Sequence, residues 1–312
     1  MRKLASALIA LSVCALAAVP ASPASATSLT CRRTLGPGEH TISVPFQGRD
    51  FPVTVYVPAR ARPADRLPAI LNLHGTQSTG AGQLAYSNMK QAADADHYLV
   101  LAPSGALPAA GGFAWNVPGV VTPPPGARDD IAFLGRVITT ATSELCVDRT
   151  RIYGTGYSGG GRMISAFACQ RPQRLAAIAP VAGLRAGRPD PADPTRPDPA
   201  SCSPARPVPV IAFHGRQDTT NPYEGGGSEY WRYSVPAALH RWTELNHYRA
   251  RPRATPLTSG VTRISYGRNA VLYAIANGGH TWPGRPIDNG NGPVTHEIDA
   301  NRLMWRFFSG RS

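Results

Sequence analysis

The sequence predicts an α/β fold in which a mostly parallel central sheet is flanked by helices on both faces. Three observations lead to this prediction. Strand-like and helix-like runs alternate along the chain, and 312 residues with 42% apolar content can bury a large core. In addition, residues 151–163 read as a strand that leads directly into a helix through a glycine-rich turn. We expect one such domain over residues 27–312.

The expected elements follow from hydrophobic periodicity. Residues 41–44 and 51–57 alternate polar and apolar side chains, which predicts an opening antiparallel pair of strands. Further strands are expected at residues 70–73, 98–102, 151–155, 207–215 and 271–276, and helices at residues 81–95, 130–145, 163–169, 235–245 and 297–308. The proline-rich passages 118–125 and 185–209 read as long surface loops, and the first is a candidate border of the functional site.

The glycine-rich turn carries a candidate nucleophile. It reads Gly-x-Ser-x-Gly, with Ser158 between Gly156 and Gly160. In a nucleophile elbow, a sharp strand-to-helix turn exposes the serine hydroxyl, and flanking glycines permit the close backbone packing. The strand before this pentapeptide and the apolar helix after it favour that interpretation over a simple glycine-rich loop.

A serine needs a base to take its proton and a carboxylate to orient that base. Asp218 follows the strand expected at 207–215, and His280 lies on a glycine-rich loop after the strand expected at 271–276. The order serine, aspartate, histidine is typical of this arrangement. The remaining candidates read as turn, capping or surface residues: His74, His214, His240, His247, His296, Asp129, Asp130, Asp148, Asp190, Asp193 and Asp198.

The chemistry also requires donors for the negative charge of a tetrahedral intermediate. One backbone N–H is expected from Gly159, the residue after the nucleophile. The other is expected from the loop after an early strand, where Thr76 stands in Leu-His-Gly-Thr-Gln-Ser at 73–78. No metal or cofactor is needed for this reaction, and no close Cys or His spacing indicates a zinc site.

Five segments resemble the secreted polyhydroxybutyrate-depolymerase-like esterases and the related feruloyl esterases, which have the α/β-hydrolase fold. The segments are residues 73–78, 146–161, 176–183, 214–223 and 279–283. The resemblance implies a triad of Ser158, Asp218 and His280. One departure is Gly159, since relatives often have alanine or asparagine there.

The beginning of the chain reads as a signal peptide over residues 1–26. Arg2 and Lys3 precede an apolar run from Leu4 to Val19, and Ala-Ser-Ala at 24–26 fits a cleavage site. The apolar run is short for a membrane span. We therefore expect a secreted, extracellular protein with no membrane association after cleavage.

Four of the five cysteines lie after the predicted signal peptide, and disulfides form in the oxidising compartments that exported proteins enter. We therefore expect two disulfides. Three pairings are open. Cys169 ends the nucleophile helix and Cys202 leads into the next strand region, which favours that pair and leaves Cys31 with Cys146.

The formal net charge is +13, and nearly all of it comes from arginine, since Lys3 and Lys90 are the only lysines. The arginines are scattered and no nucleic-acid motif accompanies them, so we expect no nucleic-acid partner. A solvated basic surface that attracts acidic polysaccharide or an anionic envelope is the favoured interpretation.

Four aromatic residues are candidates for contact with the substrate. Trp282, Tyr157, Trp115 and Tyr223 are candidates for an apolar slot, each with packing as the alternative. Within the resemblance, feruloyl esters of plant polysaccharide lead and polyhydroxyalkanoate oligomers are the alternative, because depolymerases of insoluble polyester commonly carry a further binding domain that is not expected here. A secreted polysaccharide-binding protein without catalysis is the alternative of another class.

Overall fold

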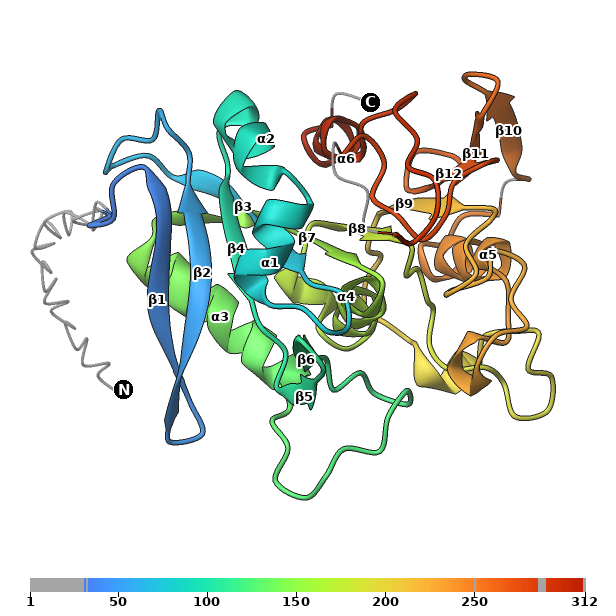
Figure 1. Ribbon diagram of the computed structural model, residues 1–312, viewed down its shortest axis with the longest axis horizontal. Helices are drawn as coiled ribbons and strands as arrows, with labels where there is room; N and C mark the ends of the chain where they lie inside the picture. The colour runs from blue at the N-terminus through green and yellow to red at the C-terminus, as the bar shows by residue number, and fades with distance from the viewer. Residues whose placement is uncertain (1–30, 32, 250, 286–289, 311–312) are drawn as a thin grey trace, which may run out of the picture. The chain divides into compact units, whose positions relative to one another are not determined.

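The computed structural model describes residues 31, 33–249, 251–285 and 290–310, so the predicted signal peptide lies outside the described residues. Ten strands of this part of the chain form one sheet, parallel at its centre and antiparallel at both edges (Figure 1). In spatial order they are β1 (Gly38–Phe46), β2 (Arg49–Val57), β4 (Leu99–Pro103), β3 (Leu67–Leu73), β7 (Val147–Tyr157), β8 (Ala177–Val181), β9 (Val210–Gly215), β12 (Ala270–Ile275), β11 (Val261–Tyr266) and β10 (Arg253–Pro256).

Helices pack against both faces of this sheet. Successive strand residues point to opposite faces, so Ile70 and Leu71 of β3 are neighbours in the chain but belong to different cores. The core with Leu71 includes side chains of α3, α4 and α5, and the core with Ile70 includes side chains of α1, α2 and α6. The helices are α1 (Gly80–Tyr86), α2 (Met89–Asp96), α3 (Asp130–Glu144), α4 (Gly159–Gln170), α5 (Val235–Leu245) and α6 (Ala300–Phe308), with short 3-10 turns η1 (Pro172–Arg174), η2 (Pro199–Ser201) and η3 (Glu229–Trp231).

The predicted fold class is confirmed, since the central sheet is mostly parallel and has helices on both faces. Three helices differ from their predicted bounds, and one of these, expected at 297–308, begins only at Ala300. The single helix expected at 81–95 is two helices, α1 and α2, and they meet at Asn88, whose φ of 53° is left-handed and interrupts the helix. The helix expected at 163–169 begins earlier, at Gly159. The prediction missed its first turn because three glycines there obscure the hydrophobic periodicity.

Several strands escaped periodicity analysis. β5 (Leu107–Ala109) and β6 (Gly112–Ala114) are three residues each and form a separate hairpin. β10 contains Pro256 and is largely exposed, so it lacks the alternation of a half-buried strand. Short and exposed strands carry little hydrophobic signal. β8 and β11 were not predicted as strands either, although β8 is completely buried.

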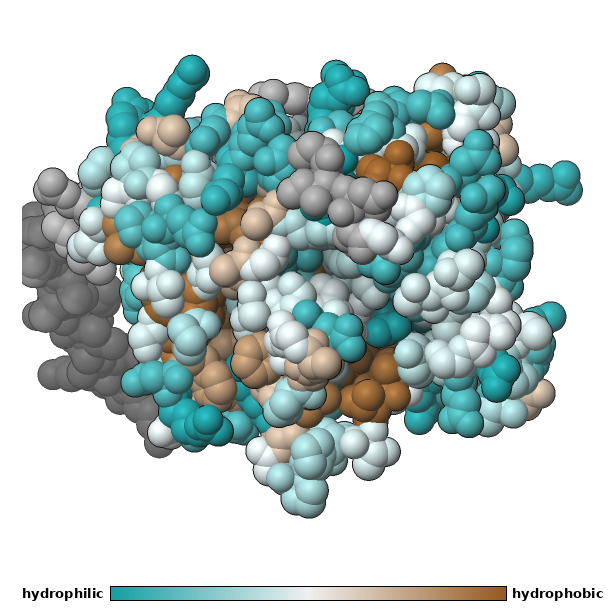
Figure 2. Space-filling model, viewed as in Figure 1, coloured by the Kyte–Doolittle hydropathy of each residue, from teal (hydrophilic) through white to brown (hydrophobic). Residues whose placement is uncertain are grey.

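The surface seen in Figure 2 is hydrophilic over most of the face shown, with smaller hydrophobic patches between the polar areas. Across the described residues, no helix has both the length and the apolar character that a bilayer crossing requires.

Two disulfides join distant parts of the chain. Cys31 pairs with Cys146, and Cys169 at the end of α4 pairs with Cys202 after η2. This is the pairing that the sequence favoured. The first bridge spans a sequence separation of 115 residues and the second a separation of 33.

Removal of each disulfide is expected to destabilise the protein because the unfolded chain regains loop entropy. The chain-entropy relation gives about 5 kcal/mol for the longer loop and about 4 kcal/mol for the shorter one. Urea unfolding of the Cys31→Ser/Cys146→Ser and Cys169→Ser/Cys202→Ser variants measures these losses. A variant that stays within about 1 kcal/mol of the parent protein would contradict this expectation.

Candidate active site

Ser158 lies on a strained turn between β7 and α4. Its φ of 52° and ψ of −113° are unfavourable for a residue with a side chain. A Cβ on Gly156 would overlap the backbone of Gly160, and a Cβ on Gly160 would overlap the carbonyl of Leu73. Both glycines are therefore required by close backbone packing, and the elbow geometry expected from the pentapeptide is present.

Asp218 lies three residues after β9, and its carboxylate is completely buried. The backbone N–H groups of Thr220 and Asn221 donate to Oδ1 at 2.9 and 2.7 Å. His280 Nδ1 lies 2.7 Å from Oδ2, and His214 Nε2 lies 3.2 Å from the same oxygen. Each oxygen thus faces two donors.

These contacts determine the charge of Asp218 and the tautomer of His280. Burial acts to raise the pKa of the Asp218 carboxyl, but the two histidines beside it outweigh burial and bring that pKa well below its usual range. Because an ionised carboxylate only accepts hydrogen bonds, His280 Nδ1 must carry the proton. In the neutral imidazole, Nε2 is then the acceptor, as a general base for Ser158 requires.

The loop that carries His280 reaches back from β12 toward the elbow. The Tyr157 hydroxyl donates to the backbone carbonyl of His280 at 2.5 Å, and the two rings lie 5.0 Å apart. Since Tyr157 directly precedes Ser158, this contact brings the histidine loop to the serine. Within the described residues, the only side-chain hydrogen bond of His280 is the one to Asp218. Hydrogen bonds from nucleophile to base often close only when substrate binds.

The two predicted oxyanion donors lie side by side. A Cβ placed on Gly159 would lie 2.8 Å from Thr76 Oγ1 and 3.3 Å from Thr76 N. Gly159 is the first residue of α4, where a backbone N–H has no acceptor within the helix. The helix dipole adds positive potential at this point. The arrangement can therefore stabilise negative charge near Ser158.

His74 braces the loop that carries Thr76. Its Nδ1 lies 2.6 Å from the carbonyl of Gly75, while its Nε2 accepts from the N–H of Gly105 at 2.8 Å. The indole N–H of Trp115 donates to the His74 carbonyl at 2.8 Å. Burial lowers the pKa of His74 to about 4, and a proton on Nε2 would also break the bond to Gly105.

Acidification is expected to destabilise the protein through His74. The unfolded histidine takes up a proton near its ordinary pKa of about 6.5, whereas the folded one does so only near 4. The stability is therefore complete above about pH 6.5 and declines as the pH falls toward 4, by about 3 kcal/mol. Urea unfolding at pH 7 and pH 4 should show this loss in the parent protein and a smaller loss in His74→Gln, whose amide oxygen can still accept from Gly105. Equal losses would contradict the assignment.

The four aromatic residues predicted for a substrate slot are buried. Trp282 is 1% exposed and its indole N–H donates to Asn301 Oδ1 at 3.2 Å. Trp115 holds His74, Tyr157 holds His280, and Tyr223 is 2% exposed with its ring 6.0 Å from that of His214. The structure gives each a role inside the protein, and their contact with substrate stays a prediction.

Most competing polar residues have the ordinary roles expected of them. Asp129 caps α3 by accepting from Ala132 N at 3.0 Å. Asp148 accepts from Thr150 N and is ion-paired with Arg151 at 2.7 Å, at the end of β7 opposite Ser158. Asp130 does more than begin a helix, because it forms a buried ion pair with Arg128 at 2.7 Å. His240, His247 and His296 are exposed.

Three polar residues near the site were missed by sequence reasoning. His214 contacts Asp218 and also lies 2.8 Å from the Asn221 carbonyl. Asn221 donates to the Ala182 carbonyl at 2.7 Å, which fixes the aspartate loop to the end of β8. Arg162 is buried in the first turn of α4. The only sequence signal was the position of His214 at a strand end, four residues before Asp218.

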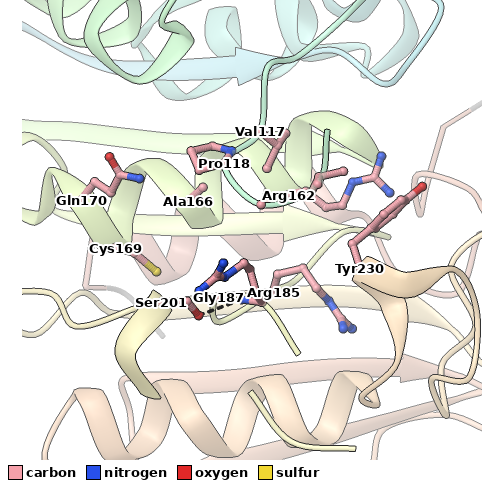
Figure 3. Close-up of a pocket in the computed structure, with 13 residues that line it drawn as sticks. Val117, Pro118, Arg162, Ala166, Cys169, Gln170, Arg185, Gly187, Ser201 and Tyr230 are labelled. Atoms are coloured by element: carbon pink, nitrogen blue, oxygen red, sulfur yellow. Dashed lines mark hydrogen bonds between the residues drawn. The ribbon is translucent and has the colours of Figure 1, made fainter. Parts of the chain in front are cut away.

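A cavity of about 250 Å³ lies beside α4, and Ser158, Gly159, Thr76, Asp218 and His280 are not among its lining residues. The cavity is lined by residues of α4, by Val117, by residues 118–120 of the first proline-rich passage and by residues after β8. Figure 3 shows Gln170 and Cys169 at the end opposite Tyr230. Arg162, one turn after Ser158, lines it as well. The first proline-rich passage therefore borders this cavity, and its contact with the site of the reaction stays a prediction.

Comparison with known proteins identifies relatives. No protein-family model matches the chain. Feruloyl esterase B of Piromyces equi is 30% identical over 247 residues, which cover 77% of this chain and 41% of that protein. The bifunctional acetylxylan esterase/xylanase XynS20E of Neocallimastix patriciarum is 26% identical over 218 residues, covering 69% of this chain and 29% of its own length. The chain therefore spans less than half of either relative.

Among solved structures, an acetyl xylan esterase from Aspergillus awamori matches 87% of this chain and 99% of its own, with a TM-score of 0.60 and 16% identity. At this level of identity the likeness concerns the fold. The chain has the α/β-hydrolase fold and is similar in sequence to these esterases.

Proposed function

We propose that this protein is a serine ester hydrolase that works through an acyl-enzyme. The observation that supports this most strongly is the 2.7 Å hydrogen bond between a buried, ionised Asp218 and Nδ1 of His280, on a loop that is hydrogen-bonded to Tyr157, the residue before the serine of the strained elbow. That bond directs the free Nε2 of the imidazole to act as a base. The two adjoining N–H groups of Gly159 and Thr76 supply the oxyanion site.

The proposed reaction has two acyl-transfer steps. Ser158 Oγ attacks the ester carbonyl while His280 Nε2 takes the hydroxyl proton, and the oxyanion receives hydrogen bonds from Gly159 and Thr76. The intermediate collapses, and the alcohol leaves with the proton returned by His280. Water, deprotonated by His280, then attacks the acyl-enzyme and releases the acid and free Ser158.

Feruloyl or similar esters of plant polysaccharide are the proposed substrates. The names of the two sequence relatives, a feruloyl esterase and an acetylxylan esterase/xylanase, support this class. Phe113 adds a structural argument, because it is 37% exposed and its backbone is hydrogen-bonded to Gln77 and Ser78 of the oxyanion loop. An exposed aromatic ring on a segment that is hydrogen-bonded to the oxyanion loop suits an aromatic acyl group. Polyhydroxyalkanoate oligomers are the alternative.

Secretion is part of the proposal. The signal-like residues 1–26 precede four cysteines that form two disulfides, and such bridges persist in oxidising compartments. Detection of the protein in the culture medium, with an N-terminus near Thr27, would support this localisation. Retention of the intact chain inside the cell would contradict it.

A substrate panel tests the activity. Purified protein is incubated with p-nitrophenyl acetate, methyl ferulate and a hydroxybutyrate oligomer, and Ser158→Ala is assayed beside it. We expect hydrolysis of the first two esters, with kcat/KM higher for methyl ferulate than for the oligomer. The reverse order would assign the polyester alternative. Equal rates for the protein and its variant would favour a non-catalytic polysaccharide-binding protein.

A further inference from the structure

The cavity beside α4 contains a pair of buried positive charges. Arg162 and Arg185 line it, and they are only 9% and 5% exposed. We propose that this cavity binds a carboxylate on the substrate, so that, among esters with aliphatic acyl groups, the protein prefers those whose acyl group ends in a free carboxylate. This inference rests on the proposed ester hydrolysis, because it assigns a specificity pocket of the same site.

Neither arginine is neutralised by the protein. Among the described residues, no Asp or Glu oxygen lies within 4.0 Å of either guanidinium, whereas Arg188 at the same cavity pairs with Asp198 at 3.2 Å. Arg162 Nε and Arg185 Nη2 are buried and have no hydrogen-bond partner there. Buried charges in proteins are normally paired, so two of them with unused donors indicate an anionic ligand.

The two charges also act on each other. Burial lowers the pKa of Arg185 to about 10, and the positive charge of Arg162 lowers it in the same direction. Arg185 nevertheless stays protonated at neutral pH. A bound anion would relieve both the burial cost and the mutual repulsion.

Neutral groups hold the guanidinium planes in place. Arg185 donates to the carbonyls of Leu184 and Tyr233 at 2.8 and 2.9 Å and stacks 3.5 Å from the ring centre of Trp231. Arg162 lies 4.8 Å from the ring centre of Tyr230, which Figure 3 shows beside it. Such stacking orients a planar fork whose remaining N–H groups match the geometry of a carboxylate.

The position of Arg162 connects this pocket to the reacting carbonyl. Its backbone N–H donates to the Ser158 carbonyl at 3.0 Å, and its Nη2 would lie 3.5 Å from a Cβ on Gly159. Its Nη1 donates to Asn221 Oδ1 at 3.3 Å, on the loop that carries Asp218. A carboxylate at the end of a short acyl chain on Ser158 can therefore reach the guanidinium.

Two nearly isosteric esters test the inference. The p-nitrophenyl monoester of glutaric acid carries a carboxylate, and p-nitrophenyl 5-methylhexanoate has an isopropyl group in its place. We expect kcat/KM, corrected for spontaneous hydrolysis, to be higher for the glutarate ester. Arg162→Gln should lower the ratio of the two kcat/KM values by about 10-fold or more, mainly through KM for the glutarate ester. Arg162→Lys should recover part of the ratio.

Arg302→Gln is the matched control, since it removes one positive charge from the exposed surface of α6. Its ratio should equal that of the parent protein. A ratio that Arg162→Gln leaves unchanged would overturn the inference and leave the arginines as packing groups. If Arg162→Gln does not fold, the parent protein is tested for inhibition of p-nitrophenyl 5-methylhexanoate hydrolysis by free glutarate. Lack of inhibition would overturn the pocket.

A binding measurement separates this inference from the proposed catalysis. Calorimetry with Ser158→Ala and the glutarate ester should detect binding that is lost when Arg162→Gln is added. If the parent protein hydrolyses neither ester, the proposed function fails, but binding that depends on Arg162 would still support the pocket. If the glutarate ester does not bind to Ser158→Ala while the parent protein hydrolyses the neutral ester, the proposed pocket is overturned and the proposed catalysis stands.

Discussion

Replacement of Ser158 with alanine is expected to lower kcat on every hydrolysed ester by about 10⁴-fold or more. Alanine removes the only atom that can form the acyl-enzyme in the proposed mechanism. The fold should persist, because the Ser158 side chain makes no capping hydrogen bond to α4 and alanine has the same Cβ on the strained backbone. Steady-state kinetics give the rate, and thermal unfolding verifies the fold.

Ser143→Ala provides the matched control for this experiment. Ser143 is an exposed serine on α3, and its hydroxyl donates only to carbonyls one turn earlier. Its variant should retain the parent rate. If Ser158→Ala kept more than about a tenth of the parent kcat with its fold intact, the nucleophile would have to be another group.

Replacement of Asp218 with asparagine is expected to lower kcat by about 10⁴-fold while changing KM little. The reason lies in the direction of its hydrogen bonds. Thr220 and Asn221 donate N–H groups to Oδ1, so the amide oxygen of asparagine must occupy that position. The amide NH₂ then replaces Oδ2 and faces His280 Nδ1, a position that is 2.7 Å away in the parent protein.

Two donors cannot share that contact, so His280 must move its proton to Nε2 or turn away. Either change removes the base that Ser158 needs. Asp148→Asn is the control, because it removes an equal charge from an aspartate at the end of β7 opposite Ser158. A kcat for Asp218→Asn close to that of Asp148→Asn would show that Asp218 does not orient the imidazole.

The elbow was predictable because its signal is local. Gly156, Ser158 and Gly160 are contiguous with a strand and a helix, and the backbone contact that demands Gly156 lies within one turn of chain, whereas the contact that demands Gly160 is with Leu73 of β3. Helix α5 was predicted with its observed bounds, since Val235–Leu245 has a clear apolar stripe after a Ser234 cap. Where the stripe was masked by glycines or broken by Asn88, the predicted bounds failed.

The sequence by itself determined the fold class and singled out Ser158, Asp218 and His280, because strand alternation and residues at strand ends are readable along one dimension. Only the tertiary structure decided which other polar side chains contact these residues or share a cavity near them. It placed His214 on Asp218, and it buried Arg162 and Arg185 together without a carboxylate. Hydrophobic periodicity reports which face of an element is buried. It contains no information on which polar groups from distant segments share a cavity, and that sharing sets their charge and their available partners.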